Sequence, residues 1–243
     1  MTAVIVQCRM SSTRFPGKAL KDLGGRPVLA WTLSAMKKVK ADAYYVATDE
    51  ASFPELEGVA RSSGWDIFSG PLDDVLKRFC LLIEKIDAEV VVRATADNPF
   101  LFYEAAESLL DEYMRRIALS PCDYMTWTGL PHGSGVEVFS GKALVAAEKL
   151  TSIPYDREHV APSLYNHRNR FSAVMQKAPA RFYYPDCRTT IDTPSDYRRA
   201  LSAVRFLSKG KAGDEPYTTE QILSAFSEPS VTHPVLFVPS VKE

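Results

Sequence analysis

Short apolar runs alternate with amphipathic stretches along the first half of the chain. Runs that are rich in β-branched residues predict buried strands at 4–6, 43–47, 65–68 and 89–92. Helical spacing of apolar residues between these runs predicts helices that begin near Pro27, at 53, at Asp73 or Asp74, and after Pro99. Regular alternation of strands and helices indicates βαβ units and therefore an α/β fold with a mostly parallel sheet.

The pattern is less regular in the second half of the chain. It predicts strands at 124–127, 136–139 and 171–175, and a further strand that ends at 189–192. It predicts helices over 141–150, 158–165, 194–207 and 218–226, and an extended tail because prolines recur after Glu228. The length of 243 residues suits one domain over the whole chain, 1–243.

Composition excludes several classes of protein. The chain is 46% hydrophobic and 24% charged with a net charge of −1, values that exclude disordered and collagen-like chains. Its apolar runs are much shorter than the roughly 20 residues that cross a bilayer, and its first residues do not resemble a signal peptide. Four scattered cysteines without a C-x-x-C pair suit a reducing compartment. We therefore expect a cytoplasmic protein that binds no membrane.

Positive charge is concentrated near the N-terminus. The first 40 residues contain eight Lys or Arg and a single acid, Asp22. On a nearly neutral protein this asymmetry indicates a local anion site, whereas a nucleic-acid surface usually makes the whole domain basic. Three of these cations, Arg9, Arg14 and Lys18, are expected in the loop after the first strand, together with three hydroxyls and Gly17. Polyphosphates need such charges, donors and room, so the loop is either a phosphate site or an exposed basic loop.

Two aspartates are candidates for holding a metal ion. Asp97 follows the fourth predicted strand, and Asp192 lies at the end of a later one. Ligands of α/β sheets bind beyond the carboxyl ends of the strands, where such carboxylates can hold Mg²⁺ beside a triphosphate. Each aspartate is equally well explained as a helix N-cap. The chain contains no G-x-x-x-x-G-K, G-x-G-x-x-G, H-E-x-x-H, G-x-S-x-G or D-x-D motif.

Residues 4–18 resemble the N-terminal signature of the sugar cytidylyltransferases, most closely the branch of the spore-coat polysaccharide biosynthesis proteins. The resemblance covers roughly residues 2–205 through further motifs at 47–49, 73–78, 93–99, 136–140, 157–160 and 191–194. More distant relatives activate 3-deoxy-manno-octulosonate and N-acylneuraminate with CTP. The resemblance implies a Rossmann-like nucleotide-diphospho-sugar transferase fold, a mostly parallel sheet flanked by helices. It also implies transfer of CMP from CTP to a sugar or sugar acid, with release of pyrophosphate, in surface polysaccharide biosynthesis.

The resemblance also implies roles for individual residues. Catalytic roles fall on Arg9, Lys18, Asp97 and Asp192, and the two aspartates would hold Mg²⁺, the expected cofactor. Nucleotide contacts fall on a set from the first loop and the later motifs, namely Gln7, Arg9, Ser12, Arg14, Lys18, Thr48, Asp74 and Thr95. The expected partners are CTP, a sugar acceptor and a second copy of the chain, bound through the substrate and dimerisation region at about 120–180, but no nucleic acid.

Some choices stay open at the level of sequence. The general base is either Asp192 or absent, with the hydroxyl activated directly by the metal. An acceptor carboxylate can pair with any of three arginines, Arg157, Arg181 and Arg188. The segment 131–135 carries His132 and Gly135 where relatives more often have Arg and Asp. Alternative functions are transfer from another nucleotide, glycosyl transfer, or nucleotide binding without catalysis.

Overall fold

A single sheet forms the centre of the molecule. The structure, a computed structural model, describes residues 1–208 and 215–232, and within them seven strands pair in the order β3-β2-β1-β4-β6-β5-β7. The strands are β1 (Thr2–Gln7), β2 (Ala43–Asp49), β3 (Asp66–Gly70), β4 (Val90–Thr95), β5 (Tyr124–Thr128), β6 (Glu137–Ser140) and β7 (Ala173–Lys177). β6 runs antiparallel to both of its neighbours and all other pairs are parallel, which confirms the predicted mostly parallel sheet.

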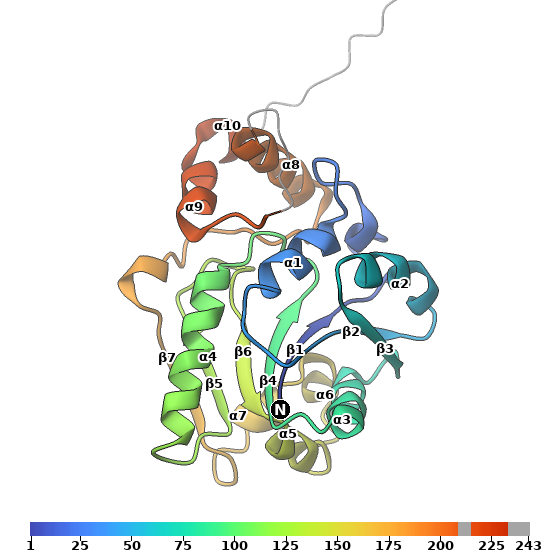
Figure 1. The fold of residues 1–243 in the computed structure, drawn as a ribbon, viewed down its shortest axis with the longest axis vertical. Helices are drawn as coiled ribbons and strands as arrows, with labels where there is room; N and C mark the ends of the chain where they lie inside the picture. The colour runs from blue at the N-terminus through green and yellow to red at the C-terminus, as the bar shows by residue number, and fades with distance from the viewer. Residues whose placement is uncertain (209–214, 233–243) are drawn as a thin grey trace, which may run out of the picture.

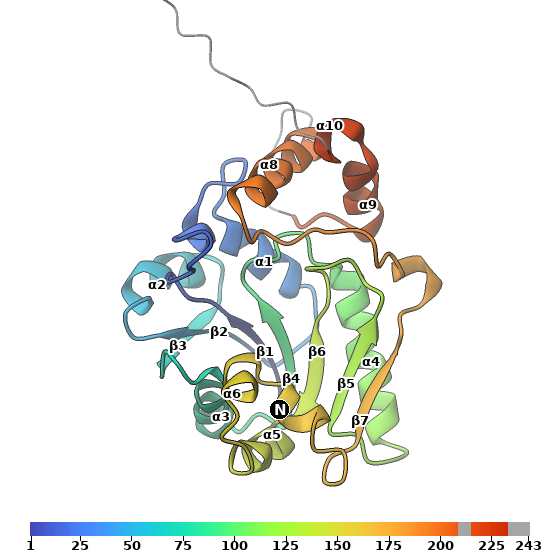
Figure 2. The same ribbon diagram turned by 180° about the vertical axis from the view of Figure 1, so that it is seen from behind.

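Helices cover both faces of the sheet (Figures 1 and 2). One face carries α1 (Val28–Met36), α2 (Phe53–Ser62) and α4 (Tyr103–Ile117). The other carries α3 (Val75–Ile86), α5 (Gly141–Glu148), α6 (Pro154–His159) and α7 (Pro162–Tyr165). Because β1 is covered on both sides, its alternate residues belong to two cores, with Val4 and Val6 in one and Ala3 and Ile5 in the other.

The C-terminal helices lie over the end of the sheet at which β1 and β4 finish (Figure 1). They are α8 (Pro194–Ser208), α9 (Thr219–Ser227) and α10 (Pro229–Thr232), and α8 packs against the first loop. Gly24 has a φ of +68°, and a Cβ at this position would lie 2.4 Å from Val204 of α8, so a side chain does not fit there. The hydroxyl of Tyr197, also on α8, donates to the carbonyl of Asp22. Helix α8 therefore fixes the loop that follows β1.

Three predicted elements differ from the structure. Residues 189–192 form no strand, because their backbone N–H groups donate to the carbonyls of His132 and Asp97 in two separate loops. The helix predicted over 158–165 is two short helices, interrupted at Val160, whose φ is +70°. The predicted extended tail begins instead with the helical turn of α10, and the rest of that tail lies outside the described residues. None of the described helices is long and apolar enough to cross a membrane.

Candidate active site

The loop after β1 turns back on itself between Met10 and Lys18. The backbone N–H groups of Ser12 and Gly17 both donate to the Met10 carbonyl, at 2.9 and 3.2 Å. Gly17 has a φ of +67°, a conformation that glycine adopts at little cost, and it begins the short 3₁₀ helix η1 (Lys18–Leu20). This turn brings Lys18 over the carboxyl ends of the parallel strands.

Residues at and just after the end of β2 support the same loop through hydrogen bonds. The Met10 N–H donates to the Ser52 hydroxyl at 2.9 Å, and that hydroxyl donates to the buried Asp49 carboxylate at 2.7 Å. Thr48, a predicted nucleotide contact, is fully buried beside Asp49, and its hydroxyl oxygen has no hydrogen-bond partner among the described residues. The end of β2 therefore positions the loop, and Thr48 does not line the cavity beside it.

The ammonium group of Lys18 joins the two predicted metal-binding aspartates. Its Nζ lies 2.7 Å from Asp97 Oδ2, 2.8 Å from the Ile191 carbonyl oxygen and 3.4 Å from Asp192 Oδ1. An ammonium has three protons to donate, and these three oxygens accept all of them. The Lys18 side chain is only 11% exposed. The structure thus brings together three of the four residues predicted to be catalytic.

Asp192 binds two further cations. Arg14 Nη2 lies 2.9 Å from Oδ1, and Arg188 Nη2 lies 2.9 Å from Oδ2. Arg188 also reaches Asp196 at 3.3 Å. Burial raises the pKa of Asp196, but hydrogen bonds from Arg188 and Thr193 outweigh burial and hold this pKa well below its usual range. The carboxylate of Asp192 is therefore enclosed by positive charge.

Neither metal-candidate aspartate is a helix cap. Helix α4 begins at Tyr103, and its N-cap is Phe102, so Asp97 lies before the cap and outside the helix. At the start of α8, Thr193 and Asp196 cap the helix reciprocally, since each backbone N–H donates to the other's side chain at 3.0 and 3.2 Å. Other residues therefore stand at the caps of these two helices, and capping does not explain the positions of Asp97 and Asp192.

A cavity of about 250 Å³ lies between the first loop, β4, α3 and α6. Seven of the predicted site residues line it: Gln7, Arg9, Ser12, Arg14, Lys18, Thr95 and Asp97. Asp192 borders it through its contacts with Lys18 and Arg14. Thr95 accepts a hydrogen bond from the Asn98 side chain at 2.6 Å, which fixes its hydroxyl at the end of β4.

Two predicted nucleotide contacts have structural partners in the protein. Asp74 caps α3 by accepting from the Lys77 N–H at 2.8 Å, also lies 3.5 Å from Arg157, and does not line the cavity. Gln7 Oε1 accepts from Arg93 Nε and Nη2 at 3.0 and 2.7 Å. Its oxygen is therefore occupied, and Gln7 can reach a ligand with its amide N–H₂.

The opposite wall of the cavity is the short helix α6. Its residues Glu158 and His159 line the cavity, and Glu158 Oε1 lies 3.6 Å from Arg9 Nη2. Both side chains of this pair are about half exposed, at 44% and 56%. Such an exposed ion pair contributes little to stability, so Arg9 can exchange Glu158 for an anionic ligand at little cost.

Arg78 is a cavity residue that the sequence analysis did not single out as a site residue. It projects from α3, lines the cavity and is only 1% exposed. Its guanidinium donates to the carbonyls of Pro71 and Leu72 at 2.6 to 3.1 Å and has no carboxylate within ion-pair distance among the described residues. Burial lowers its pKa, and the charge of Asp49 opposes this effect. A buried cation without a paired carboxylate is costly unless an anion completes its surroundings.

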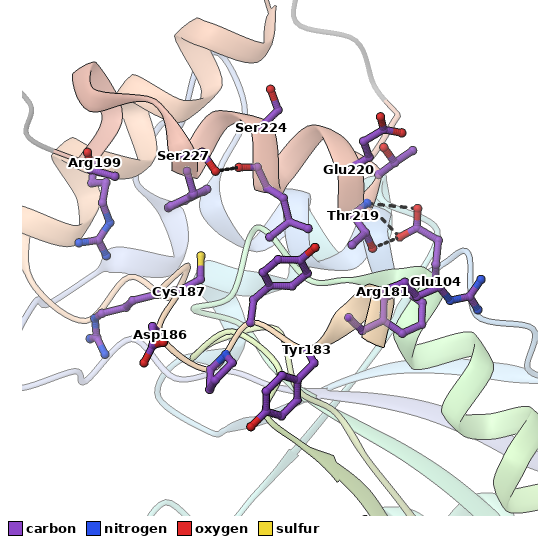
Figure 3. A pocket seen from close by; sticks show the side chains of 18 residues that line it. Glu104, Arg181, Tyr183, Asp186, Cys187, Arg199, Thr219, Glu220, Ser224 and Ser227 are labelled. Atoms are coloured by element: carbon purple, nitrogen blue, oxygen red, sulfur yellow. Dashed lines mark hydrogen bonds between the residues drawn. The ribbon is translucent and has the colours of Figure 1, made fainter. Parts of the chain in front are cut away.

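A larger cavity of about 1360 Å³ lies between residues 181–188 and helices α8 and α9 (Figure 3). Arg181 and Arg188, two of the three arginines considered for an acceptor carboxylate, line it. Arg188 is paired with Asp192 and Asp196, whereas Arg181 has no acidic partner among the described residues. The third, Arg157, is paired with Glu148 at 2.7 Å and lines neither cavity.

The segment 131–135 packs against the aspartate-bearing loops. The N–H groups of Thr189 and Thr190 donate to the His132 carbonyl at 2.9 and 3.2 Å. The His132 side chain and Gly135 are exposed and line neither cavity. The segment therefore supports the backbone around Asp192, and its sequence departures do not alter the cavity walls.

The donor set suits a metal ion that is shared with a ligand. The described residues contain no group of three or more His, Cys, Asp or Glu side chains that could hold a metal. Asp97 and Asp192 instead direct one carboxylate oxygen each toward a common cation, Lys18 Nζ. Mg²⁺ at phosphate sites uses one or two carboxylates and completes its shell with phosphate and water oxygens. The residues present thus fit Mg²⁺ bound together with a polyphosphate.

Comparison with known proteins places the chain in a family. The profile of the family described as cytidylyltransferase matches residues 3–223. The spore coat polysaccharide biosynthesis protein SpsF of Bacillus subtilis is 32% identical over 87% of this chain and 88% of its own. A 3-deoxy-manno-octulosonate cytidylyltransferase of Anaeromyxobacter is 33% identical over 44% of this chain and 45% of its own.

Comparison of structures agrees with the sequence comparisons. The structure of a cytidylyltransferase from Leptospira borgpetersenii superposes with a TM-score of 0.84 at 22% identity, covering 98% of both chains. This similarity shows a common fold, the Rossmann-like fold that the resemblance implied. The family profile and the full-length relative extend it to family membership. The chain belongs to the sugar cytidylyltransferase family.

Proposed function

We propose that the protein transfers CMP from CTP to a hydroxyl of a sugar or sugar acid and releases pyrophosphate, with Mg²⁺ as its cofactor. The observation that carries this proposal is the contact of Lys18 with Asp97 and Asp192 beside a cavity that Arg9 and Arg14 also line. Family membership supports the choice of CTP, and the relative named for 3-deoxy-manno-octulosonate supports a sugar acid as acceptor.

The proposed reaction needs positioning and positive charge rather than covalent catalysis. The acceptor oxygen bonds to the α-phosphorus, and the bond from that phosphorus to the oxygen bridging to the β-phosphorus breaks. Its electron pair leaves with pyrophosphate. Arg9, Arg14 and Lys18 would align the triphosphate and neutralise the charge that develops on its oxygens. Mg²⁺, held by Asp97 and Asp192, would add positive charge at the phosphates.

Asp192 is the proposed acceptor of the hydroxyl proton. Its carboxylate contacts two cations of the first loop through Oδ1 and Arg188, which lines the larger cavity, through Oδ2. Asp192 is therefore an acid whose cationic partners line both cavities. Replacement by Asn keeps the size of the side chain and removes the base, so Asp192→Asn should lower kcat. It should also lower the thermal midpoint, because Lys18, Arg14 and Arg188 lose an anionic partner. Full turnover in this variant would exclude the role.

The proposal includes a cellular setting. The name of the B. subtilis relative supports a role in polysaccharide biosynthesis, and the cysteines, all free within the described residues, suit the reducing cytoplasm. We further propose a homodimer that forms through the region at about 120–180. Sedimentation equilibrium at working concentrations should give twice the chain mass of 27.0 kDa. A mass of one chain would contradict the dimer and leave the reaction untouched.

Pyrophosphate release tests the reaction directly. CTP, UTP, GTP or ATP would be incubated with Mg²⁺ and a panel of sugar acids that includes 3-deoxy-manno-octulosonate and N-acetylneuraminate, and products would be identified by mass. We expect release from CTP with formation of a CMP-sugar, abolished by Asp97→Ala and unchanged by Asp111→Ala, an exposed acid of α4. Turnover with another nucleotide would overturn the base assignment. No turnover with any pair would favour a nucleotide-binding protein without activity.

A further inference from the structure

A cage of three oxygens surrounds the Lys18 ammonium group. Two oxygens are the carboxylates of Asp97 and Asp192, and the third is the backbone carbonyl of Ile191. Carboxylate and carbonyl oxygens are also the ligands that hard divalent cations take from proteins. The point at which these three oxygens converge is therefore already occupied by a cation, the ammonium group of Lys18.

The cage is built by long-range contacts and does not depend on Lys18 alone. The Ile191 N–H donates to the Asp97 carbonyl at 2.9 Å, so the two aspartate-bearing loops are joined directly. Asp196 accepts from the Asp192 and Thr193 N–H groups at 3.1 and 3.0 Å and fixes the following turn. These bonds leave the three oxygens in place when the lysine side chain moves.

We propose that Lys18 is the resident cation of the metal site, so that a divalent ion enters the cage only when a nucleotide draws Lys18 out of it. This inference rests on the proposed function, in which Asp97 and Asp192 hold Mg²⁺. Two cations at one set of oxygens repel strongly, particularly where side chains are only 11% exposed, as those of Lys18 and Asp192 are. Divalent ion and lysine therefore exclude one another.

The triphosphate provides the alternative partner for Lys18. Lys18 lines the 250 Å³ cavity together with Arg9 and Arg14, so phosphate oxygens bound there lie within reach of its flexible stem. When Nζ turns to a phosphate, Asp97 and the Ile191 carbonyl are released to the metal. Asp192 Oδ1 also accepts from Arg14 at 2.9 Å, and Arg14 lines the same cavity, so the triphosphate draws this second cation away from Asp192 as well. Metal and nucleotide then bind with positive coupling, and each raises the affinity for the other by the same factor.

Titration with Mn²⁺, followed by the electron paramagnetic resonance of the unbound ion, tests the inference without measuring turnover. The wild-type protein should bind Mn²⁺ weakly alone and at least about ten-fold more tightly with saturating CTP. Lys18→Met removes the resident cation, so this variant should bind Mn²⁺ about ten-fold more tightly than wild type in the absence of CTP. Lys18→Gln, which keeps a polar end without charge, should behave in the same way, and melting curves check that both variants fold.

Lys21→Met is the matched control. Lys21 belongs to the same loop but faces the Phe15 ring at 5.0 Å, so its loss changes the net charge equally without opening the cage. An equal gain in Lys21→Met, or no gain in either Lys18 variant, would overturn the inference while leaving the proposed function intact. Tight CTP binding that is independent of Mn²⁺ would overturn the metal role in the proposed function, and the cage inference with it.

Discussion

At the scale of single residues, the cations that line the cavity differ in how firmly their side chains are held. Arg9 is half exposed and weakly paired, Lys18 is held by three oxygens, and Arg78 is buried against two backbone carbonyls. Arg78 cannot leave its position, because its guanidinium is anchored to Pro71 and Leu72. A fixed cation in a site acts on an anion without reorganising, which makes it a strong electrostatic contributor.

We expect Arg78→Met to weaken CTP binding about ten-fold or more, since a charge-assisted contact contributes roughly 1.5–3 kcal/mol. Inorganic triphosphate, titrated in parallel, should lose affinity to a similar extent if the guanidinium acts on phosphates. The neighbouring Lys77→Met, whose side chain is 41% exposed, is the charge-matched control. Affinities within two-fold of wild type in Arg78→Met would show that the residue supports only the loop after β3.

The ionisation of the Asp196 carboxyl group makes the stability of the fold depend on pH. The pKa of this carboxyl is lower in the folded protein than in the unfolded chain, because its hydrogen bonds outweigh burial. The ionised form is therefore the one that stabilises the fold. Its contribution is complete above the unfolded pKa of about 4 and is lost progressively as the pH falls below that value.

Asp196→Asn should accordingly lower the free energy of unfolding by about 1–3 kcal/mol at pH 7 and by less at pH 3. Urea denaturation at the two pH values measures the difference. A deficit that is equal at both would show that the carboxylate charge is not what stabilises the start of α8. Asp186→Asn, at an exposed position, controls for the general loss of an acid.

At the scale of elements, the position of α3 is determined both by its local sequence and by tertiary packing. Val75, Phe79 and Leu82 recur at helical spacing and are buried, and Asp74 caps the helix as its sequence predicted. Arg78 lies three residues after Val75, on the same buried stripe. A charged residue at an apolar position of a helix was the available signal for this site residue. Its burial depends on Gly70, the last residue of β3, because a Cβ at that position would lie 2.9 Å from Arg78 Cγ.

Asp74→Ala separates the two roles open to this residue. Loss of the N-cap should lower the free energy of unfolding by about 1 kcal/mol, whereas CTP affinity should change little because Asp74 does not line the cavity. Asp74→Asn, which caps equally well, should restore stability. If Asp74→Ala and Asp74→Asn both lose CTP affinity, the implied nucleotide contact is correct and the cap is secondary.

Other elements show where sequence reasoning ends. The strands and helices of the first half were predictable because their apolar periodicity is local. The segment 189–192 was predicted as a strand end from its β-branched composition, but its partners, His132 and Asp97, lie far away in sequence. Asp192 was therefore identified correctly as a neighbour of Asp97 in space, although the element expected to carry it does not exist.

At the scale of the whole molecule, the sheet brings together loops from both ends of the chain. The basic first loop follows β1, Asp97 follows β4, and Asp192 precedes α8 (Figure 1). Helix α8 packs on the first loop, and the Ile191 N–H joins the loops that carry the two aspartates. The charge asymmetry of the sequence predicted an anion site in the first loop. It did not predict that acids 79 and 174 residues away would neutralise the loop's lysine.

Calorimetric titration of CTP, UTP, GTP and ATP in the presence of Mg²⁺ tests the central claim most directly, because it requires no knowledge of the acceptor. The account predicts tight binding of CTP alone, dependent on Mg²⁺ and lost in Asp97→Ala but not in Asp111→Ala. Preference for another nucleotide would contradict the cytidylyl assignment. Absence of binding by all four would contradict the assignment of the cavity beside Lys18 as a triphosphate site.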